Sequence, residues 1–337
     1  MKYSKLTQPT QKQIIQIEKL IQSLPEQVYF QSILFFNACR ATPLLTPYYY
    51  VASDGEKIVG VLLAFRQVQY RLFPLDFLSS RTIIWGGPRV LDDNIQVYEG
   101  LYEIYQNEQR ISIYTQVRNL FDQSNHQEVM KQLGFQYEEH LNIIIDLRKS
   151  EEQLWREVDS KRRNEIRRAI KEGTTVEVAN EQNSLKECYL ILKKVYQRAK
   201  LPLPPLKHFE SLWHYNNERE GLKLFVAKFE GKIIGCMMCL AYGDTLFDYY
   251  AGAYSTYYQK YPNDLIPWEV FKWGKENNFT KFDFGGAGKP NVPYGVRDYK
   301  KKFGGTMVNY GRFEKIHFPI LYRIVTWGFN LRKTLIK

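Results

Sequence analysis

Two segments of the chain share one pattern of apolar and polar positions. An apolar run enters a short turn with an acidic residue and a glycine, at residues 53–56 and 229–231, and a second apolar run leaves it, at 59–65 and 234–242. Two apolar runs joined by such a turn are typical of a β-hairpin. The hairpins also share sequence at matching offsets, since Val51-Ala52 before Lys57-Ile-Val-Gly recurs as Val226-Ala227 before Lys232-Ile-Ile-Gly. The repeat indicates an internal duplication.

A helix and then a strand follow each predicted hairpin. The pattern predicts a helix over 94–109 and a strand over 111–115 in the first half, and a helix over 264–278 and a strand over 281–284 in the second. The chain of 337 residues is also longer than one core usually supports. We therefore expect an α+β protein with mixed sheets in two similar domains. The first would cover residues 1–148 and the second 149–316.

Between the repeats, residues 151–172 have the periodicity of one basic helix that ends at Gly173. Its apolar stripe consists of Trp155, Val158, Ile166, Ala169 and Ile170. Arg162 falls inside this stripe, where its guanidinium needs an anion or buried acceptors. Two interpretations stay open: Arg162 extends outward to solvent from a basic face, or it faces a phosphate.

Composition and charge restrict the class of protein, its partners and its location. The hydrophobic content of 44% and aromatic content of 15% are those of a globular chain, and the net charge of +11 favours phosphorylated substrates, RNA or an acidic membrane surface as partners. No apolar run reaches the roughly 18 residues of a spanning helix, and the first residues lack a signal-peptide core. Four cysteines without framework spacing favour reduced thiols, so we expect an intracellular protein.

A glycine-rich turn follows the last predicted strand and leads into a cationic segment at 297–302. Gly285, Gly286 and Gly288 lack the Cβ atoms that would keep an anionic ligand from the backbone. The alternative is a tight loop with a solvated basic face. Asp283 lies between two phenylalanines of the strand, so its buried carboxylate is either a base or a cap for the next loop, with Glu269 as a weaker candidate base.

Four runs of residues, at 154–171, 262–268, 282–286 and 294–305, together resemble the FemAB family. Members of that family are peptidoglycan bridge aminoacyltransferases and their relatives, built from two acetyltransferase-like (GNAT) domains. The resemblance covers residues 40–315, and its tandem architecture agrees with the repeat. The chain has no long heptad pattern, so it resembles the family members without a coiled-coil arm.

The resemblance implies transfer of an aminoacyl or acyl group to an amine of a phosphate-bearing cell-envelope precursor. The donor would be aminoacyl-tRNA, with acyl-CoA as the alternative, and no tightly bound cofactor is expected. Lys300 matches the family lysine that lies at the developing oxyanion, and Tyr294 belongs to the same motif. Arg198 and Arg40 match phosphate-binding positions, and Arg297 is a further candidate from its glycine-rich surroundings, although pairing with Asp298 is an equal alternative.

The turn at 257–264 has no glycine to hold a CoA pyrophosphate, and Asn263 or Asp264 is expected to cap the next helix. Two rival functions stay open. One is an acyl-CoA N-acyltransferase acting on an amino sugar of a surface polysaccharide, and the other is a non-catalytic RNA-binding or membrane-binding protein. No DNA partner is expected.

The sequence gives little support for a metal site or a redox site. Cys236 and Cys239 have metal or redox spacing, but they lie on a predicted strand where residues three apart face opposite ways, and no histidine has ligand spacing with a second ligand. We expect no metal.

The amphipathic residues 318–337 either pack back on the first domain or lie on an anionic membrane. In the second case the protein, which we expect in the cytoplasm, would be peripheral to the inner membrane surface.

Overall fold

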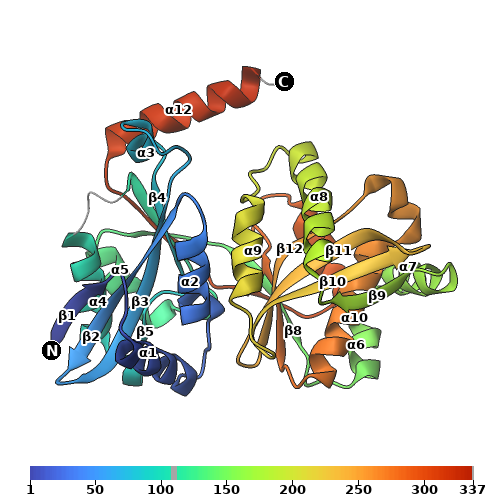
Figure 1. The fold of residues 1–337 in the computed structure, drawn as a ribbon, viewed down its shortest axis with the longest axis horizontal. Helices are drawn as coiled ribbons and strands as arrows, with labels where there is room; N and C mark the ends of the chain where they lie inside the picture. Colours follow the sequence, from blue (N-terminus) through green and yellow to red (C-terminus); the bar gives the residue numbers. More distant parts are fainter. Residues whose placement is uncertain (108–111, 336–337) are drawn as a thin grey trace. The chain divides into compact units, whose positions relative to one another are not determined.

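The computed structural model describes residues 1–107 and 112–335, and side chains of the last helix as far as Trp327. It divides the chain into two compact units. Unit 1 consists of Met1–Glu139 and Tyr310–Lys337, and unit 2 is His140–Asn309 (Figure 1). The chain therefore leaves unit 1, builds unit 2 and returns to unit 1.

Unit 1 is built on an eight-stranded mixed sheet of order β1-β2-β3-β4-β6-β15-β7, with β5 paired to β3. Its strands are β1 (Lys2–Leu6), β2 (Leu45–Asp54), β3 (Lys57–Gln67), β4 (Arg81–Trp85), β5 (Arg89–Val90), β6 (Tyr114–Arg118), β7 (Gln136–Glu138) and β15 (Arg312–Ile316). The first predicted hairpin is present as β2 and β3. Neighbouring β2 residues face opposite ways, since Tyr49 stacks on Phe36 of one face and Tyr50 meets Tyr105 on the other.

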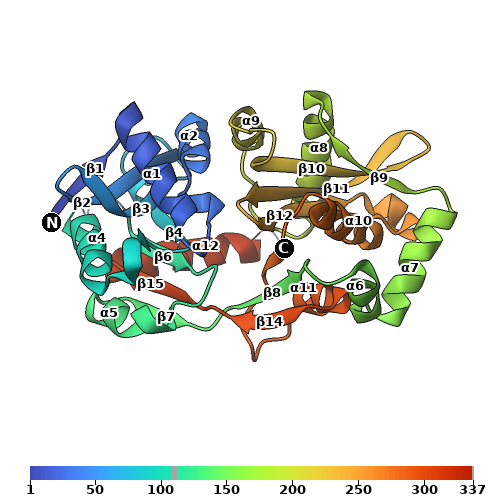
Figure 2. The same cartoon turned by 90° about the horizontal axis from the view of Figure 1, so that it is seen from below.

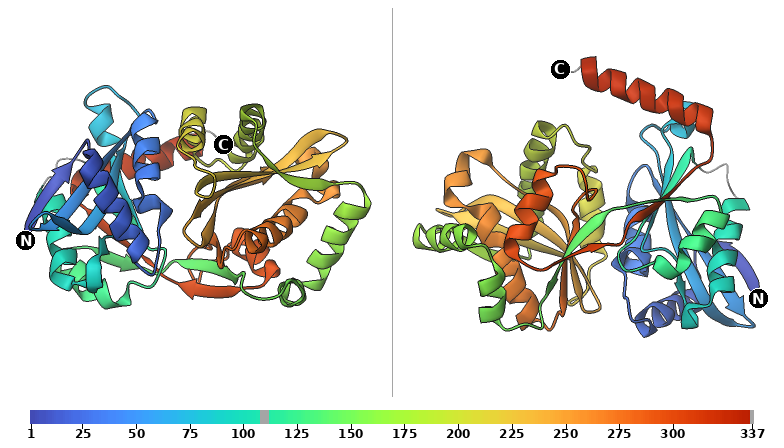
Figure 3. Two further views of the ribbon diagram at one scale, coloured as in Figure 1. Left: turned by 60° about the horizontal axis from the view of Figure 1, so that its bottom comes forward. Right: turned by 180° about the vertical axis from the view of Figure 1, so that it is seen from behind.

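Helices cover both faces of this sheet. They are α1 (Gln11–Ser23), α2 (Ile33–Ala41), α3 (Leu75–Leu78), α4 (Ile95–Asn107), α5 (Gln127–Gln132) and α12 (Pro319–Leu335). The predicted helix over 94–109 is α4, and its last two predicted positions lie outside the described residues. The first turns of α12 contact unit 1, where the ring of Phe318 lies 5.3 Å from that of Phe77 and the ring of Tyr322 lies 5.2 Å from that of Tyr114. Figure 3 shows α12 beside α3.

Unit 2 repeats the same plan on a seven-stranded sheet of order β14-β8-β13-β12-β11-β10-β9. Its strands are β8 (Leu141–Asp146), β9 (Thr175–Ala179), β10 (Gly221–Phe229), β11 (Lys232–Tyr242), β12 (Thr245–Ala253), β13 (Lys281–Gly286) and β14 (Thr306–Asn309). Its helices are α6 (Glu151–Glu157), α7 (Ser160–Lys171), α8 (Gln182–Arg198), α9 (Leu206–His214), α10 (Pro262–Glu276) and α11 (Gly295–Lys300). The second predicted hairpin is β10 and β11.

Figure 2 shows α8 and α9 on one face of the unit 2 sheet and α10 on the other. Two glycines allow this close packing. A Cβ on Gly252 would lie 3.0 Å from Val195 of α8, and one on Gly235 would lie 3.0 Å from Pro262 of α10. Cys236 and Cys239 of β11 face opposite sides of the sheet, as expected. The Sγ of Cys236 points to the carbonyl of Cys188 in α8, and Cys239 belongs to the core beneath α10.

The unit boundaries differ from those expected at 148 and 316. β8 belongs to unit 2 because it pairs with β13 and β14, so the first boundary falls before residue 140. β15 belongs to unit 1 because it pairs with β6 and β7, so the second falls after residue 309. Strand pairing between distant segments decides both positions, and hydrophobic periodicity does not carry that information.

The single helix predicted over 151–172 is wrong, because the chain breaks into α6 and α7 at Val158 and Asp159. Val158 is extended, with φ −67° and ψ 132°, and the carboxylate of Asp159 accepts the backbone N–H of Lys161 at 3.0 Å. Asp159 is thus the N-cap of a new helix. Ile170, expected in the apolar stripe, is instead 53% exposed.

Among the described residues, no helix is both long and apolar enough to cross a membrane.

Candidate active site in the second unit

The parallel strands β12 and β13 of unit 2 separate partway along their length. They pair at three positions and the last is Phe247 with Asp283, after which β13 continues alongside β8 as far as Gly286. A bulge in β12, opposite Met238 and Cys239, lies at the same point and leaves Tyr249 without a register partner. Bulges of this kind occur next to active sites, where they redirect side chains. The sheet therefore opens just beyond Phe247.

The corresponding strands of unit 1 stay together. β4 and β6 pair in parallel over all five residues of each, from Arg81 with Tyr114 to Trp85 with Arg118, and the N–H of Gly86 extends the contact to the carbonyl of Arg118 at 2.8 Å. The duplication has thus kept the strand order while the opening is a feature of unit 2.

Lys300 fills part of this opening. It ends α11, and its Nζ donates to the carbonyls of Phe284 and Gly286, the second at 3.2 Å. Both carbonyls belong to the part of β13 that has lost β12. An ammonium group has three N–H donors, so one is left for an oxygen of a ligand. Lys301 and Lys302, the two lysines that follow, are exposed, so the alternative of a solvated basic face fits them and does not fit Lys300.

Two carboxylates act electrostatically on Lys300. Burial lowers the pKa of Lys300, while the nearby charges of Asp248 and Asp283 raise it again. Burial likewise raises the pKa of both carboxyls to about 6, and the charge of Lys300 opposes that rise. Three ionisable groups that act on one another, each displaced from its ordinary pKa, are typical of a functional site.

Asp283 has the hydrogen bonds of a structural cap. Its Oδ1 accepts the N–H of Gly285 at 2.7 Å and the side-chain amide of Asn142 at 3.2 Å. It is 3% exposed. The carboxylate therefore holds the start of the glycine turn. Glu269, the weaker candidate base, is paired on α10 with Lys272 at 2.8 Å.

Asp248 was missed by the sequence reasoning. It follows Phe247 on β12, at the first position beyond the last pair with β13, and unlike Asp283 it keeps partial exposure. The rings of Tyr196 and Tyr250 lie 5.4 Å apart, and the charge of Asp248 adds to the rise that burial causes in the pKa of Tyr196. Its signal in the sequence resembles that of Asp283, an acid among aromatic residues, but the strand that carries Asp248 was not predicted.

The glycine turn has close contacts that explain its composition. Gly285 and Gly288 have φ of +67° and +75°, which favours glycine. A Cβ on Gly288 would lie 3.0 Å from the ring of Tyr294, so Tyr294 packs on the turn. Gly286 contributes the carbonyl bound by Lys300. The turn is thus shaped by internal contacts.

Arg297 holds the loop that follows the turn. Its guanidinium donates to the carbonyls of Lys289 at 2.6 Å and Val292 at 2.7 Å, and also to Ala287 at 3.4 Å. Neither phosphate binding nor pairing with Asp298 is needed to explain its position, because backbone carbonyls already take its donors.

We expect Arg297→Leu to loosen residues 287–293, because three carbonyls lose their donor. Limited proteolysis should cut this segment at least several-fold faster than in the unchanged protein, while Arg167→Leu, which removes an exposed arginine of α7, leaves the rate unaltered. An unchanged cutting rate in Arg297→Leu together with weaker binding of a phosphate-bearing ligand would contradict the loop-holding role.

The side chain of Arg162 is only 11% exposed, so it does not extend outward to solvent, and its partner is a carboxylate of the protein. The guanidinium forms an ion pair with Asp264 of α10, lies 3.3 Å from Glu165 and stacks over the rings of Tyr299 and Phe303. The expectation that Asp264 or Asn263 caps α10 is wrong. Pro262 is the first helical residue and Tyr261 the N-cap, which turns Asp264 inward to Arg162.

The other two predicted arginines are exposed. Arg198 ends α8 and donates to the hydroxyl of Tyr258 at 2.5 Å, and Arg40 lies in the last turn of α2 in unit 1. Both have guanidinium donors available to a ligand. Within the described residues no group of three or more His, Cys, Asp or Glu side chains has the geometry of a metal site.

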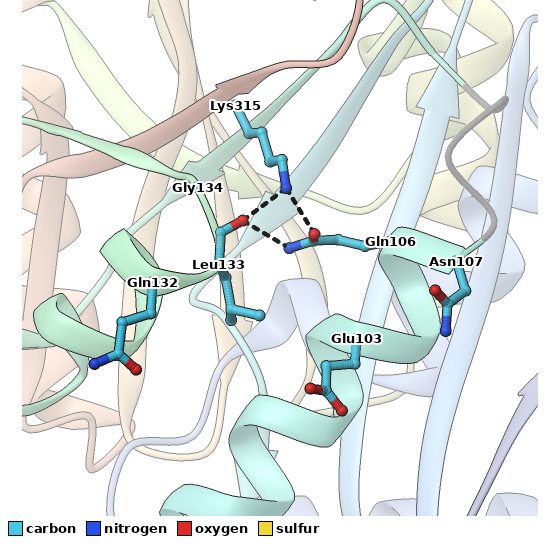
Figure 4. A pocket seen from close by; sticks show the side chains of 7 residues that line it. All are labelled: Glu103, Gln106, Asn107, Gln132, Leu133, Gly134 and Lys315. Atoms are coloured by element: carbon cyan, nitrogen blue, oxygen red, sulfur yellow. Dashed lines mark hydrogen bonds between the residues drawn. The ribbon is translucent and has the colours of Figure 1, made fainter.

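A polar hollow of about 590 Å³ lies in unit 1, between α4 and α5 (Figure 4). Its lining residues are Glu103, Gln106, Asn107, Gln132, Leu133, Gly134 and Lys315. The Nζ of Lys315 is already bound to the amide oxygen of Gln106 and the carbonyl of Leu133, both at 2.6 Å. None of the predicted site residues lines this hollow.

Part of this chain is similar to a known domain family and to a known enzyme. Residues 160–301 match the model of the acetyltransferase (GNAT) domain family, a range that contains β12, β13 and Lys300. A UDP-N-acetylmuramoylpentapeptide-lysine N(6)-alanyltransferase of Weissella viridescens is 24% identical over 217 residues. That alignment covers 62% of this chain and 60% of the relative, which is less than two thirds of its length.

Solved structures extend the likeness to more than nine tenths of the chain. The crystal structure of FemX has a TM-score of 0.74 at 15% identity and covers 95% of this chain and 99% of its own. A tandem GNAT protein from the clavulanic acid biosynthesis pathway has a TM-score of 0.59 at 8% identity and covers 93% and 98%. The predicted fold of two tandem GNAT-like domains is therefore confirmed, and so is the resemblance to the FemAB family.

Proposed function

We propose that this chain is an aminoacyltransferase of the FemAB type, which acts in the cytoplasm on an amine of a phosphate-bearing peptidoglycan precursor. The observation that carries the proposal is the ammonium group of Lys300, held between two separated strands by the carbonyls of Phe284 and Gly286 with one N–H left over. The relative from Weissella viridescens supports the acceptor, since its name specifies alanyl transfer to a UDP-linked muramoylpentapeptide.

The reaction needs a positive group near the carbonyl oxygen of the donor, where negative charge develops, and a proton acceptor near the amine nitrogen of the acceptor. The unprotonated amine nitrogen attacks the ester carbonyl carbon of the donor, a C–N bond forms and negative charge develops on the carbonyl oxygen. The C–O bond to the tRNA ribose then breaks, and the ribose oxygen leaves as a hydroxyl group with the proton that the attacking nitrogen has lost. Lys300 would stabilise the oxyanion because its remaining N–H is preorganised by two fixed carbonyls.

Asp248 is the better placed carboxylate for the proton. The oxygens of Asp283 are engaged by Gly285 and Asn142, whereas Asp248 is partly exposed on the facing strand. With a pKa raised to about 6 by burial, Asp248 is ionised at neutral pH and can accept the proton that the amine nitrogen loses as the C–N bond forms. We assign it the role of general base and keep Asp283 as the residue that positions the turn.

Turnover should therefore depend on pH with an acid limb near pH 6. Below that value Asp248 is protonated, and the rate is expected to fall about tenfold per pH unit. Because the charge of Asp283 raises the pKa of Asp248, Asp283→Asn should move the limb to lower pH. Asp248→Asn should lower turnover by about 10² or more and abolish the limb. Glu269→Gln is the control, and a limb unmoved in both aspartate variants would refute the assignment.

Phosphate contacts are assigned to the exposed arginines, Arg198 and Arg40. Their guanidinium groups are accessible, and Arg198 is already oriented by the hydroxyl of Tyr258. Arg162 and Arg297 are engaged within the protein and are assigned structural roles.

Incubation of the protein with charged tRNAs, acyl-CoAs and muramyl precursors identifies the donor. The measurement is the increase in mass of the acceptor. We expect the increase to equal one aminoacyl residue and to depend on charged tRNA. Transfer from acyl-CoA to an amino sugar would replace the proposal with the acyl-CoA alternative. Binding of RNA without any mass increase would instead identify a non-catalytic binder.

A further inference from the structure

Unit 1 exposes seven large apolar side chains in two segments that are far apart in sequence. We call them the apolar patch: Tyr70, Leu72, Phe73, Leu75, Ile320, Ile324 and Trp327. Four of them are very open, since Leu72 is 74%, Phe73 80%, Ile320 76% and Trp327 69% exposed. Single exposed apolar residues are ordinary, but a group of this size marks an interaction surface.

The two segments of the apolar patch are neighbours in the fold. The ring of Phe77 in α3 lies 5.3 Å from that of Phe318, one residue before α12 begins. Figures 1 and 3 show α3 and α12 side by side. In α12 the exposed residues Ile320, Ile324 and Trp327 are spaced by four and three positions and so share one face. Tyr322 holds the opposite side against Tyr114.

The charges around the apolar patch are mostly positive, and the two nearby carboxylates are engaged: Asp76 lies 3.8 Å from Arg66, and Glu314 accepts the hydroxyl of Tyr322 at 3.5 Å. Arg71 lies next to Leu72, Arg323 lies next to Ile324, and both are exposed. Neither residues 66–75 nor residues 315–337 contain aspartate or glutamate, and the second range has five lysines and arginines. Apolar side chains that project from a basic surface match a bilayer with anionic headgroups, where the rings and aliphatic chains enter the interface and the basic groups meet lipid phosphates.

We propose that the apolar patch, formed by the segment before α3 and one face of α12, docks unit 1 on an anionic lipid bilayer. A second copy of the chain is disfavoured as the occupant because two identical basic borders would repel each other. The proposal goes beyond the transfer reaction and does not depend on it, since docking needs neither donor nor acceptor.

Vesicle sedimentation with the full-length protein tests the proposal. We expect binding to vesicles of phosphatidylcholine with about one third phosphatidylglycerol, weak binding to phosphatidylcholine alone, and a decrease as salt is added. Leu72→Ser with Phe73→Ser, and separately Ile324→Ser with Trp327→Ser, should each lower the partition coefficient by about tenfold or more. All four side chains are exposed, so both variants should keep the thermal midpoint of the unchanged protein.

The matched control removes exposed leucines from unit 2, as Leu190→Ser with Leu201→Ser, and should bind vesicles as the unchanged protein does. Patch variants that bind like this control would overturn the proposal, as would equal binding to neutral and anionic vesicles. A dimer that the patch variants convert to a monomer, with vesicle binding unaltered, would show that a second copy is the occupant. Loss of turnover on a water-soluble precursor would bear on the transfer reaction alone.

Discussion

Replacing Lys300 by methionine is expected to lower turnover by about 10² to 10³-fold while the protein stays folded. Methionine is an unbranched side chain one atom shorter than lysine and has no charge, so the developing oxyanion loses its N–H donor. The pKa of Asp248 and Asp283 should rise further without the neighbouring ammonium, and the protonated carboxyls then avoid an uncompensated buried charge. Steady-state turnover and a thermal melt of the same preparation measure both effects.

Lys301→Met and Lys302→Met are the matched controls, because both lysines are exposed neighbours in the same triplet. Each should retain turnover within about twofold, since surface substitutions away from a site have small effects. Lys300→Arg tests geometry, because a guanidinium keeps the charge but does not fit the pair of carbonyls that bind Nζ. Full turnover in Lys300→Met would remove Lys300 from the mechanism, whatever the behaviour of the controls.

The architecture was predictable because it depends on local pattern and on repetition. Each hairpin has its own alternation and turn residues, and Val51-Ala52 and Val226-Ala227 introduce the same order of elements. The break at Asp159 was missed for a physical reason. The apolar positions before and after it continue one helical stripe, and a capping aspartate inside such a stripe is indistinguishable from a surface residue of a longer helix.

The chemistry of the site was only partly predictable. Lys300 was predicted from a family motif. Its two carbonyl partners are free to bind it because β12 and β13 stop pairing beyond Phe247. Hydrophobic periodicity does not predict how strands that are distant in sequence pair. Asp248 was missed for the same reason, since only the position where the strands separate distinguishes it from a core residue. For Arg162 the sequence left open whether the side chain extends to solvent or faces a phosphate, and its partner Asp264 was assigned to a cap because Pro262 was not used as the start of α10.

The pair of Arg162 and Asp264 is expected to give the largest change in stability. Their side chains are only 11% and 9% exposed, so removing Arg162 leaves the buried carboxylate of Asp264 without its partner, and removing Asp264 leaves Arg162 with only the less buried Glu165. Arg162→Met and Asp264→Leu should each lower the free energy of unfolding by about 3 to 5 kcal/mol. The double variant should recover most of that loss, because two apolar side chains replace both charges. Urea unfolding of the four proteins forms a double-mutant cycle, in which midpoint shifts at a common slope report stability.

The same cycle separates a structural role of Arg162 from a phosphate-binding one. Arg162 stacks on Tyr299 and Phe303, which flank Lys300 in sequence, so its loss should also displace α11 and reduce turnover. If Arg162 acts through Asp264, the double variant recovers stability and part of the turnover, with little change in KM for the precursor. If Arg162 binds phosphate, the single variant keeps its stability, KM rises, and the second substitution restores nothing. The ion pair buried between α7 and α10 favours the first outcome, because a guanidinium already neutralised by a carboxylate has little attraction left for a phosphate.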